Sequence, residues 1–122
     1  MFTMNKTILM SDAKHFSTEQ PINPYYDQVD LDHKKAILEH KQIQDLLIQA
    51  GVKITTVPSP SDCQDGVYTA NWALVRGDKA VLARLPNARK KEEEYAKKVL
   101  ECLDKKVYRV PRKLKFSAQG DA

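Results

Sequence analysis

The sequence predicts one mixed α/β domain, in which short strands are covered by two outer helices. Helical periodicity appears twice, at residues 31–50 and 89–105, and short β-branched segments flank both stretches. The resulting order is strand, helix, strand, hairpin, helix, strand, which is one strand–helix–strand unit and most of a second. The 122 residues are one domain's worth of chain, so no second domain is expected.

The first unit begins and ends with a strand. Residues 6–10 are predicted to be a buried strand, and the β-branched residues 52–57 form the second one. Pro58 and Pro60 stop that strand, because proline cannot donate a ladder hydrogen bond. Residues 11–30 lack periodicity and are predicted to form a long loop, which in a compact domain is commonly functional.

The helix predicted at residues 31–50 is amphipathic. Asp30 or Asp32 can cap its start, and Gly51 ends it at the position where glycine is favoured. Its apolar side chains recur three and four positions apart, at Ala36, Ile37, Ile43, Leu46, Leu47 and Ala50. We expect this helix to pack outside the strands.

The second unit begins with a hairpin. Residues 73–75 and 79–83 are predicted to pair across the Arg76-Gly77-Asp78 turn, where that triplet is a solvated turn and not an adhesion motif. After the second helix, residues 107–110 and 114–116 are each predicted to be a short strand.

The helix predicted at residues 89–105 has glutamates near its start and lysines later, which suits the helix dipole. Its buried stripe is predicted to consist of Tyr95, Val99, Cys102 and Leu103. Cys102 is therefore expected to be a small core residue.

Composition excludes several classes of protein. Hydrophobic residues make up 42% of the chain and charged residues 30%, and the formal charge is +4. Without a basic stripe or an aromatic platform, nucleic-acid binding is not expected. No apolar run approaches the roughly 20 residues that span a bilayer, and residues 1–10 lack a signal-peptide core. A cytoplasmic protein with no membrane partner is the default.

The cysteines and histidines do not suggest a metal centre. Cys63 and Cys102 form no Cys-x-x-Cys pair, and two cysteines in a reducing compartment are predicted to be free thiols. His15, His33 and His40 have no metal-site spacing with them. The chain also lacks the glycine-rich dinucleotide fingerprint, so no metal or cofactor is expected.

The stretch from Cys63 to Leu74 carries the polar groups that a binding site needs. Asp65-Gly66 is a turn dipeptide, and residues 67–69 form a β-prone run ahead of Asn71. In an extended segment, Asp65 and Asn71 would point to the same side. A pocket for a polar ligand uses such a pair, although an ordinary turn and strand end would also explain both residues.

Residues 65–72, Asp-Gly-Val-Tyr-Thr-Ala-Asn-Trp, resemble the Asp-x-Val-Phe-Thr-x-Asn signature of the guanidine-modifying (pentein) superfamily. That superfamily includes amidinotransferases, arginine deiminases, arginine dihydrolases and dimethylarginine dimethylaminohydrolases. Further segments resemble it in the same order and spacing, at residues 8–11, 22–26, 82–85, 89–93 and 116–121. The resemblance runs along nearly the whole chain but covers less than half of a typical member.

The resemblance implies a five-fold pseudo-symmetric α/β propeller, of which residues 1–122 would be the N-terminal portion, about two of the repeated modules. It also implies attack of a cysteine thiolate on the guanidinium carbon, a covalent intermediate, and completion by water or an amine. In a full member the cysteine lies near the C-terminus and the histidine in the middle. We therefore expect no catalytic residue in this chain, and Cys63 is at the wrong place for the nucleophile.

Two functions follow as hypotheses. The first is an N-terminal fragment of an amidinotransferase- or hydrolase-type enzyme acting on the guanidino group of arginine or a related compound. The second is a non-catalytic, truncated module that binds arginine or oligomerises. In both, hydrophobic faces made for missing modules would be exposed and would favour homo-oligomers.

The resemblance also assigns substrate-binding residues. Asp65 takes the place of the acid that grips the guanidinium, Arg84 that of an arginine that binds the substrate carboxylate, and Asn23 that of a substrate-contacting asparagine. Asn71 and Ala70 stand where the dimethylarginine branch has acids, which favours unmethylated arginine. Asn23, Asp65, Asn71 and Arg84 are expected to cluster on one face, unless Asp65 and Arg84 simply pair with each other.

Overall fold

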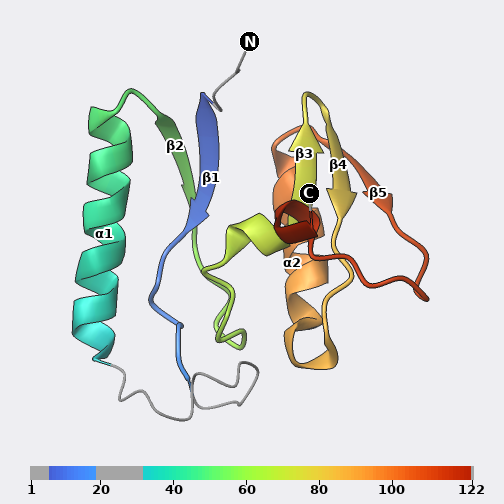
Figure 1. Ribbon diagram of the computed structural model, residues 1–122, viewed down its shortest axis with the longest axis horizontal. Helices are drawn as coiled ribbons and strands as arrows, with labels where there is room; N and C mark the ends of the chain where they lie inside the picture. Colours follow the sequence, from blue (N-terminus) through green and yellow to red (C-terminus); the bar gives the residue numbers. More distant parts are fainter. Residues whose placement is uncertain (1–5, 19–31, 122) are drawn as a thin grey trace.

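Two strand–helix–strand units lie side by side in a computed structural model, which describes residues 6–18 and 32–121 (Figure 1). Asn23 and most of the predicted loop at 11–30 lie outside the described residues. The segment after the second strand runs from the first unit to the second and carries the stretch at 63–72. The predicted mixed α/β class, with helices outside short strands, is confirmed.

The first unit consists of β1 (Thr7–Ser11), α1 (His33–Gln49) and β2 (Lys53–Val57). The two strands are parallel, with Ile8 opposite Ile54. Asp32 caps α1, because its side chain accepts a hydrogen bond of 3.0 Å from the backbone N–H of Lys35. Gly51 follows the helix with φ +88°, a left-handed conformation that glycine adopts without strain. These bounds lie within two residues of the prediction.

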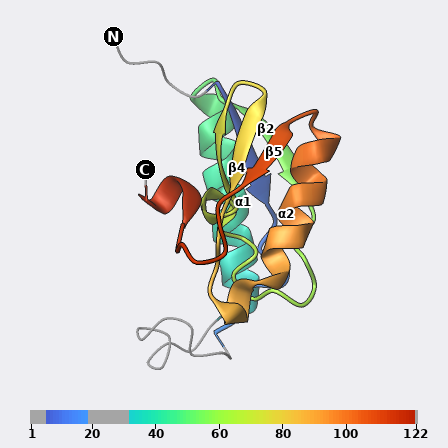
Figure 2. The same cartoon turned by 90° about the vertical axis from the view of Figure 1, so that its right-hand side faces the viewer.

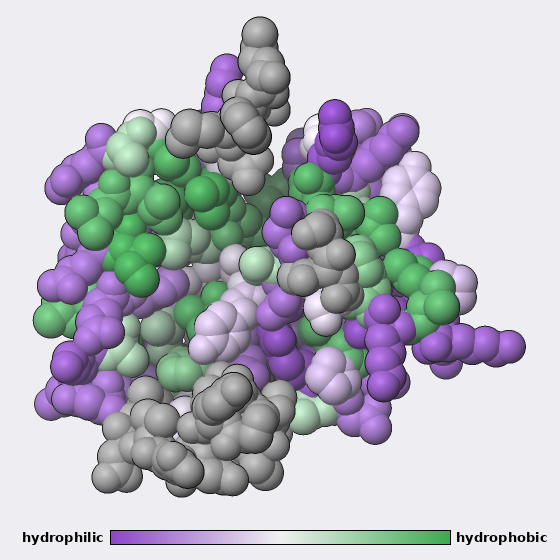
Figure 3. Space-filling model, in the orientation of Figure 1, coloured by the Kyte–Doolittle hydropathy of each residue, from purple (hydrophilic) through white to green (hydrophobic). Residues whose placement is uncertain are grey.

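The apolar stripe of α1 is less buried than predicted. None of the helix's residues is buried; the helix packs on β2, and His40 hydrogen-bonds the backbone oxygen of Ser11 in β1. A two-stranded sheet is too narrow to cover the stripe, so the larger apolar side chains stay exposed. They are Ile37, Leu38, Ile43, Leu46 and Ile48. Figure 3 shows apolar side chains gathered over α1 and its neighbouring strands.

The second unit holds a three-stranded sheet in the order β3 (Ala73–Arg76), β4 (Lys79–Leu82), β5 (Lys106–Arg109). The β3–β4 hairpin is antiparallel and β5 runs parallel to β4. Gly77 has φ +60°, which confirms the turn. In place of the strand predicted at 114–116, Phe116 makes a single bridge to Arg84, because the adjoining residues form turns.

Helix α2 (Lys91–Cys102) covers one side of this sheet, and the 3-10 helix η4 (Ala118–Asp121) lies on the other (Figure 2). The hydrophobic core lies between α2 and the sheet and consists of Trp72, Ala73, Ala80, Leu82, Ala96 and Leu100. From the first unit, Leu9 and Val57 pack against it while partly buried. Trp72 is the largest core side chain and is 1% exposed.

The buried side of α2 differs from the predicted stripe. Glu92, Glu93, Ala96 and Leu100 are buried, whereas Tyr95 and Val99 are only half-buried. The expectation that Cys102 and Leu103 are buried is wrong, because both are exposed. The helix is turned so that the two glutamates reach arginine partners in the interior.

No helix in the described parts of the chain combines the length and apolar character that crossing a membrane requires.

Candidate functional site

The stretch at 63–72 is a series of turns rather than a strand. Backbone hydrogen bonds link Cys63 to Gly66, Asp65 to Tyr68 and Tyr68 to Asn71, and the 3-10 helix η2 spans Thr69–Asn71. The expectation that Asp65 and Asn71 share one side of an extended segment is therefore wrong. A hydrogen bond of 2.9 Å from the Thr69 hydroxyl to the backbone oxygen of Leu9 holds η2 against β1.

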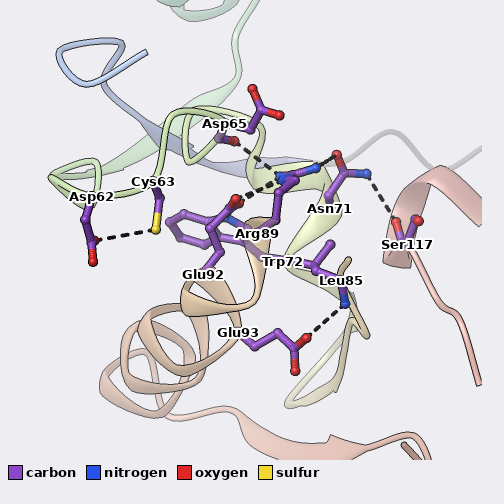
Figure 4. Close-up of polar contacts among 10 residues, drawn as sticks. All are labelled: Asp62, Cys63, Asp65, Asn71, Trp72, Leu85, Arg89, Glu92, Glu93 and Ser117. Atoms are coloured by element: carbon purple, nitrogen blue, oxygen red, sulfur yellow. Dashed lines mark hydrogen bonds and ion pairs between the residues drawn. The ribbon is translucent and has the colours of Figure 1, made fainter. Parts of the chain in front are cut away.

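A buried arginine brings Asp65 and Asn71 together instead. Arg89 ends the 3-10 helix η3 (Asn87–Arg89) just before α2 and is 9% exposed. Its Nη1 donates to Oδ1 of Asn71 at 3.0 Å, and its Nη2 donates to the backbone oxygen of Asp65 at 3.2 Å. Figure 4 shows the guanidinium between these two residues and Glu92.

Glu92 is the charge partner of Arg89. Nε and Nη2 of Arg89 donate to the two carboxylate oxygens of Glu92 at 2.8 and 2.7 Å, a paired arrangement that charge-assisted hydrogen bonds favour. Glu92 is 0% exposed, and the indole Nε1 of Trp72 donates to it at 3.3 Å. The carboxylate is thus fully enclosed and accepts three hydrogen bonds.

Asn71 links this network to the C-terminal segment. Its amide Nδ2 donates to the backbone oxygen of Ser117 at 3.3 Å, while its Oδ1 accepts from Arg89. Both ends of the amide are therefore used inside the chain. Asp65 is 4% exposed and so also lies inside.

Arg84 is held in a second polar cluster. Its Nε donates to the backbone oxygen of Val110 at 2.7 Å, and its Nη1 lies 3.4 Å from Oε1 of Glu93. The other oxygen of Glu93 accepts from the backbone N–H of Leu85 at 2.9 Å. The ion pair of Arg84 is therefore with Glu93, so the simple Asp65–Arg84 pair is not formed.

The two clusters meet at residues 116 and 117. The backbone N–H of Arg84 donates to the oxygen of Phe116 at 2.8 Å, and Asn71 bonds the next residue, Ser117. The structure therefore joins Asp65 and Asn71 directly through Arg89 and brings Arg84 to the same C-terminal segment. Asn23, the fourth predicted residue, lies outside the described residues.

Sequence reasoning missed Arg89 as the centre of the arrangement. The signal was present, because an arginine three positions before a glutamate at a helix start places both charges on one face. Arg84 has a second notable position, at the edge of an open groove of about 840 Å³ between residues 84–94 and 109–117.

Cys63 does not have the character of an activated nucleophile. Cys63 is 5% exposed, and burial, together with the nearby charges of Asp62 and Glu92, raises the pKa of its thiol to about 12. The thiol is therefore protonated near neutral pH, while the attacking species in cysteine chemistry is the thiolate. Cys102 is exposed on α2. In the described ranges, no cluster of three histidine, cysteine or acidic residues could hold a metal.

Comparisons with known proteins match nearly the whole chain. The family model described as "N,N dimethylarginine dimethylhydrolase, eukaryotic" matches residues 10–122. The bifunctional arginine dihydrolase/ornithine cyclodeaminase AgrE of Nostoc sp. is 31% identical over 116 residues, which are 93% of this chain and 16% of that protein. The corresponding protein ArgZ of Synechocystis sp. is 30% identical over 118 residues, 94% of this chain and 17% of that protein.

Solved structures show the same relationship. The N-terminal domain of the cyanobacterial arginine dihydrolase ArgZ, bound to product, aligns with a TM-score of 0.88 and 29% identity, covering 97% of this chain and 44% of that one. A dimethylarginine dimethylaminohydrolase shares the fold, with a TM-score of 0.74 and 21% identity over 94% of this chain and 45% of that one. The chain thus spans less than half of either solved chain.

Proposed function

Because the chain belongs to the eukaryotic N,N dimethylarginine dimethylhydrolase family, within the guanidine-modifying superfamily, we propose that it is the N-terminal portion of an enzyme acting on a guanidino group. The substrate is arginine or a related compound, and the reaction is hydrolysis of a C–N bond or amidino transfer. The observation that carries this proposal is the alignment of 97% of the chain with the N-terminal domain of an arginine dihydrolase.

Unmethylated arginine is the substrate we favour. By its resemblance to the superfamily signature, Asn71 takes the place of an acid of the dimethylarginine branch, and Ala70 that of a glutamate. A neutral amide at Asn71 already accepts from the guanidinium of Arg89, so one guanidinium is bound here by an amide oxygen and a carboxylate. The two arginine dihydrolases that match by sequence are consistent with this choice.

We assign the substrate-binding roles as follows. Asp65 pairs with the substrate guanidinium, and Arg84 binds the substrate carboxylate through its Nη2, which makes none of the contacts with Val110 or Glu93. Asn71 contributes at the same site, and its bonds to Arg89 and Ser117 fix its orientation. Asn23 completes the set from outside the described residues.

The covalent step belongs to groups beyond this sequence. A cysteine thiolate attacks the guanidinium carbon, the amine leaves with a proton supplied by a histidine, and water or an amine releases the amidino group. The raised pKa of Cys63 supports assigning the nucleophile elsewhere. The two strand–helix–strand units support assigning the chain to about two modules of a five-fold α/β propeller.

Titration with L-arginine, followed by amide NMR shifts, tests the binding part of the proposal. We expect weak, saturable shifts around Asp65 and Arg84, because the missing modules would supply further walls of the pocket. Agmatine, which lacks the carboxylate, should lose the shifts near Arg84 only. Asp65→Asn should abolish the shifts caused by arginine and by agmatine, while its spectrum keeps the peak dispersion of a folded protein. Arginine shifts that persist unchanged in Asp65→Asn would refute the assignment of Asp65.

A turnover assay tests the catalytic part. The purified chain should release neither ornithine, citrulline nor ammonia from arginine above background. Release that disappears in Cys63→Ser would show that the nucleophile has been misassigned.

A non-catalytic oligomerisation module is the second candidate function. The observation that favours it is the exposed apolar side of α1, including Leu38 at 56% and Leu46 at 64% exposure. Light scattering over a range of concentrations tests it. Self-association that Leu38→Lys with Leu46→Lys abolishes would support this function, whereas a monomer at all concentrations would reject it.

A further inference from the structure

Basic side chains converge on the groove of about 840 Å³ that runs between the β4–α2 connection and the segment after β5. One wall comes from residues 84–94 and the other from residues 109–117. The bridge between Arg84 and Phe116 joins the two walls. The basic lining residues are Arg84, Lys90, Arg109, Arg112, Lys113 and Lys115, and the acidic ones are Glu93 and Glu94.

The formal charge of the residues that line the groove equals the net charge of the whole chain. Six basic and two acidic side chains give its lining a formal charge of +4. The chain as a whole has 20 basic and 16 acidic residues and the same formal charge of +4. The rest of the sequence is therefore balanced, with fourteen residues of each sign.

Both acids of the groove are already paired. Glu93 pairs with Arg84, and Glu94 lies 2.5 Å from Nη2 of Arg109. Those contacts leave four lining cations that make no ion pair with any described residue. They are Lys90 on one wall and Arg112, Lys113 and Lys115 on the other.

We propose that this groove binds a small multivalent phosphate anion through Lys90, Arg112, Lys113 and Lys115. Several cations that line one groove can each contact a different oxygen of a phosphate chain, and the guanidinium of Arg112 can bind two oxygens of one phosphate. The groove volume lies within the roughly 300–1,000 Å³ of small-molecule sites. The phosphate chain can come from a nucleoside triphosphate or from inorganic polyphosphate.

A nucleic acid fits the groove less well. Proteins that track single strands combine a basic path with aromatic platforms on which bases stack. None of the described lining residues is aromatic. Cations from both segments line one groove of about 840 Å³, which suits a compact anion. Arg84, to which we assign the substrate carboxylate, lines the same groove, but the anion we propose contacts the other four cations and needs no guanidino chemistry.

Titration with sodium tripolyphosphate at physiological ionic strength, followed by calorimetry and amide NMR shifts, tests the proposal. We expect saturable binding with shifts at residues 90 and 112–115, and weaker binding of pyrophosphate and orthophosphate in that order. Arg112→Gln with Lys113→Gln should weaken binding about tenfold, since each exposed charge contact contributes modestly. The matched control is Lys34→Gln with Lys41→Gln on α1, which removes the same charge from an exposed surface and should leave the affinity unchanged.

Titrations with other ligands and with the control variant identify the source of the anion. Equal affinity for ATP and tripolyphosphate would show that only the phosphate chain is recognised, and tighter binding of ATP would assign a nucleotide. An equal loss of affinity in the Lys34/Lys41 control would show that binding depends only on the overall charge of the protein, and would overturn the proposal. An oligonucleotide that binds more tightly than tripolyphosphate, and increasingly so with length, would also overturn it in favour of nucleic acid.

Discussion

Replacing Arg89 with methionine should destabilise the protein strongly, because it leaves the carboxylate of Glu92 buried without its charge partner. Glu92 is 0% exposed and would keep only the indole N–H of Trp72, at 3.3 Å, after losing hydrogen bonds of 2.7 and 2.8 Å. Breaking a buried ion pair by removing one partner costs about 3–5 kcal/mol. The loss is a large fraction of the roughly 5–15 kcal/mol that stabilises a typical domain.

Thermal unfolding followed by circular dichroism measures this loss. At roughly 4 °C per kcal/mol for a chain of 122 residues, the midpoint should fall by about 10–20 °C. The double variant Arg89→Met with Glu92→Leu should be more stable than Arg89→Met alone, because it removes both charges and leaves none unpaired. A loss below about 1 kcal/mol in the single variant, or a double variant that loses the sum of both single effects, would refute this account of the network.

Three further predictions concern single sites. A thiol reagent at pH 8, without denaturant, should modify one cysteine per chain. Burial and nearby carboxylates raise the pKa of Cys63 to about 12, so its thiol stays neutral at that pH. Rapid modification of two cysteines would contradict this. Burial of Asp12 is outweighed by hydrogen bonds, led by the Ser59 hydroxyl, which lower its pKa below 3.8. The ionised carboxylate of Asp12 therefore stabilises the fold above pH 3.8, and this stabilisation is lost as the pH falls through the lowered pKa. Asp12→Asn should make the free energy of unfolding fall less steeply at acid pH. An unchanged acid dependence would contradict this role of Asp12. Gly66→Ala should lower the free energy of unfolding, measured by urea denaturation, by about 1–3 kcal/mol, because the added Cβ would lie 2.8 Å from Cδ of Pro60. An unchanged urea midpoint would show that the loop adjusts to the methyl group.

The regular elements were predictable because local signals determine them. The Asp32 cap and Gly51 bound α1 within two residues of the prediction. The turns at residues 63–72 were not predictable in the same way, because residues 67–69 have a β propensity that indicates a strand. Tertiary contacts override that propensity, notably the bond from Thr69 to β1 and the bonds from Arg89 to Asp65 and Asn71.

The orientation of α2 was mispredicted for a related reason. The apolar stripe predicts that Cys102 is buried, and it does not include Glu92 or Glu93. Both glutamates are buried because Arg89 and Arg84 reach them. The basic groove could not be predicted from the sequence either. Lys90 lies more than 20 positions from Arg112, and only the fold brings them to one groove.

The unequal burial of the two helices has a consequence for how the molecule opens. The core packs against α2, whereas α1 buries no residue and rests on a two-stranded sheet, an arrangement that is marginal by itself. Local unfolding free energies span the range from near zero to the global value within one protein. Backbone amides of α1 should therefore exchange with deuterium well before those of α2. The first unit would act as a separate foldon that detaches while the Arg89 network keeps the second unit intact.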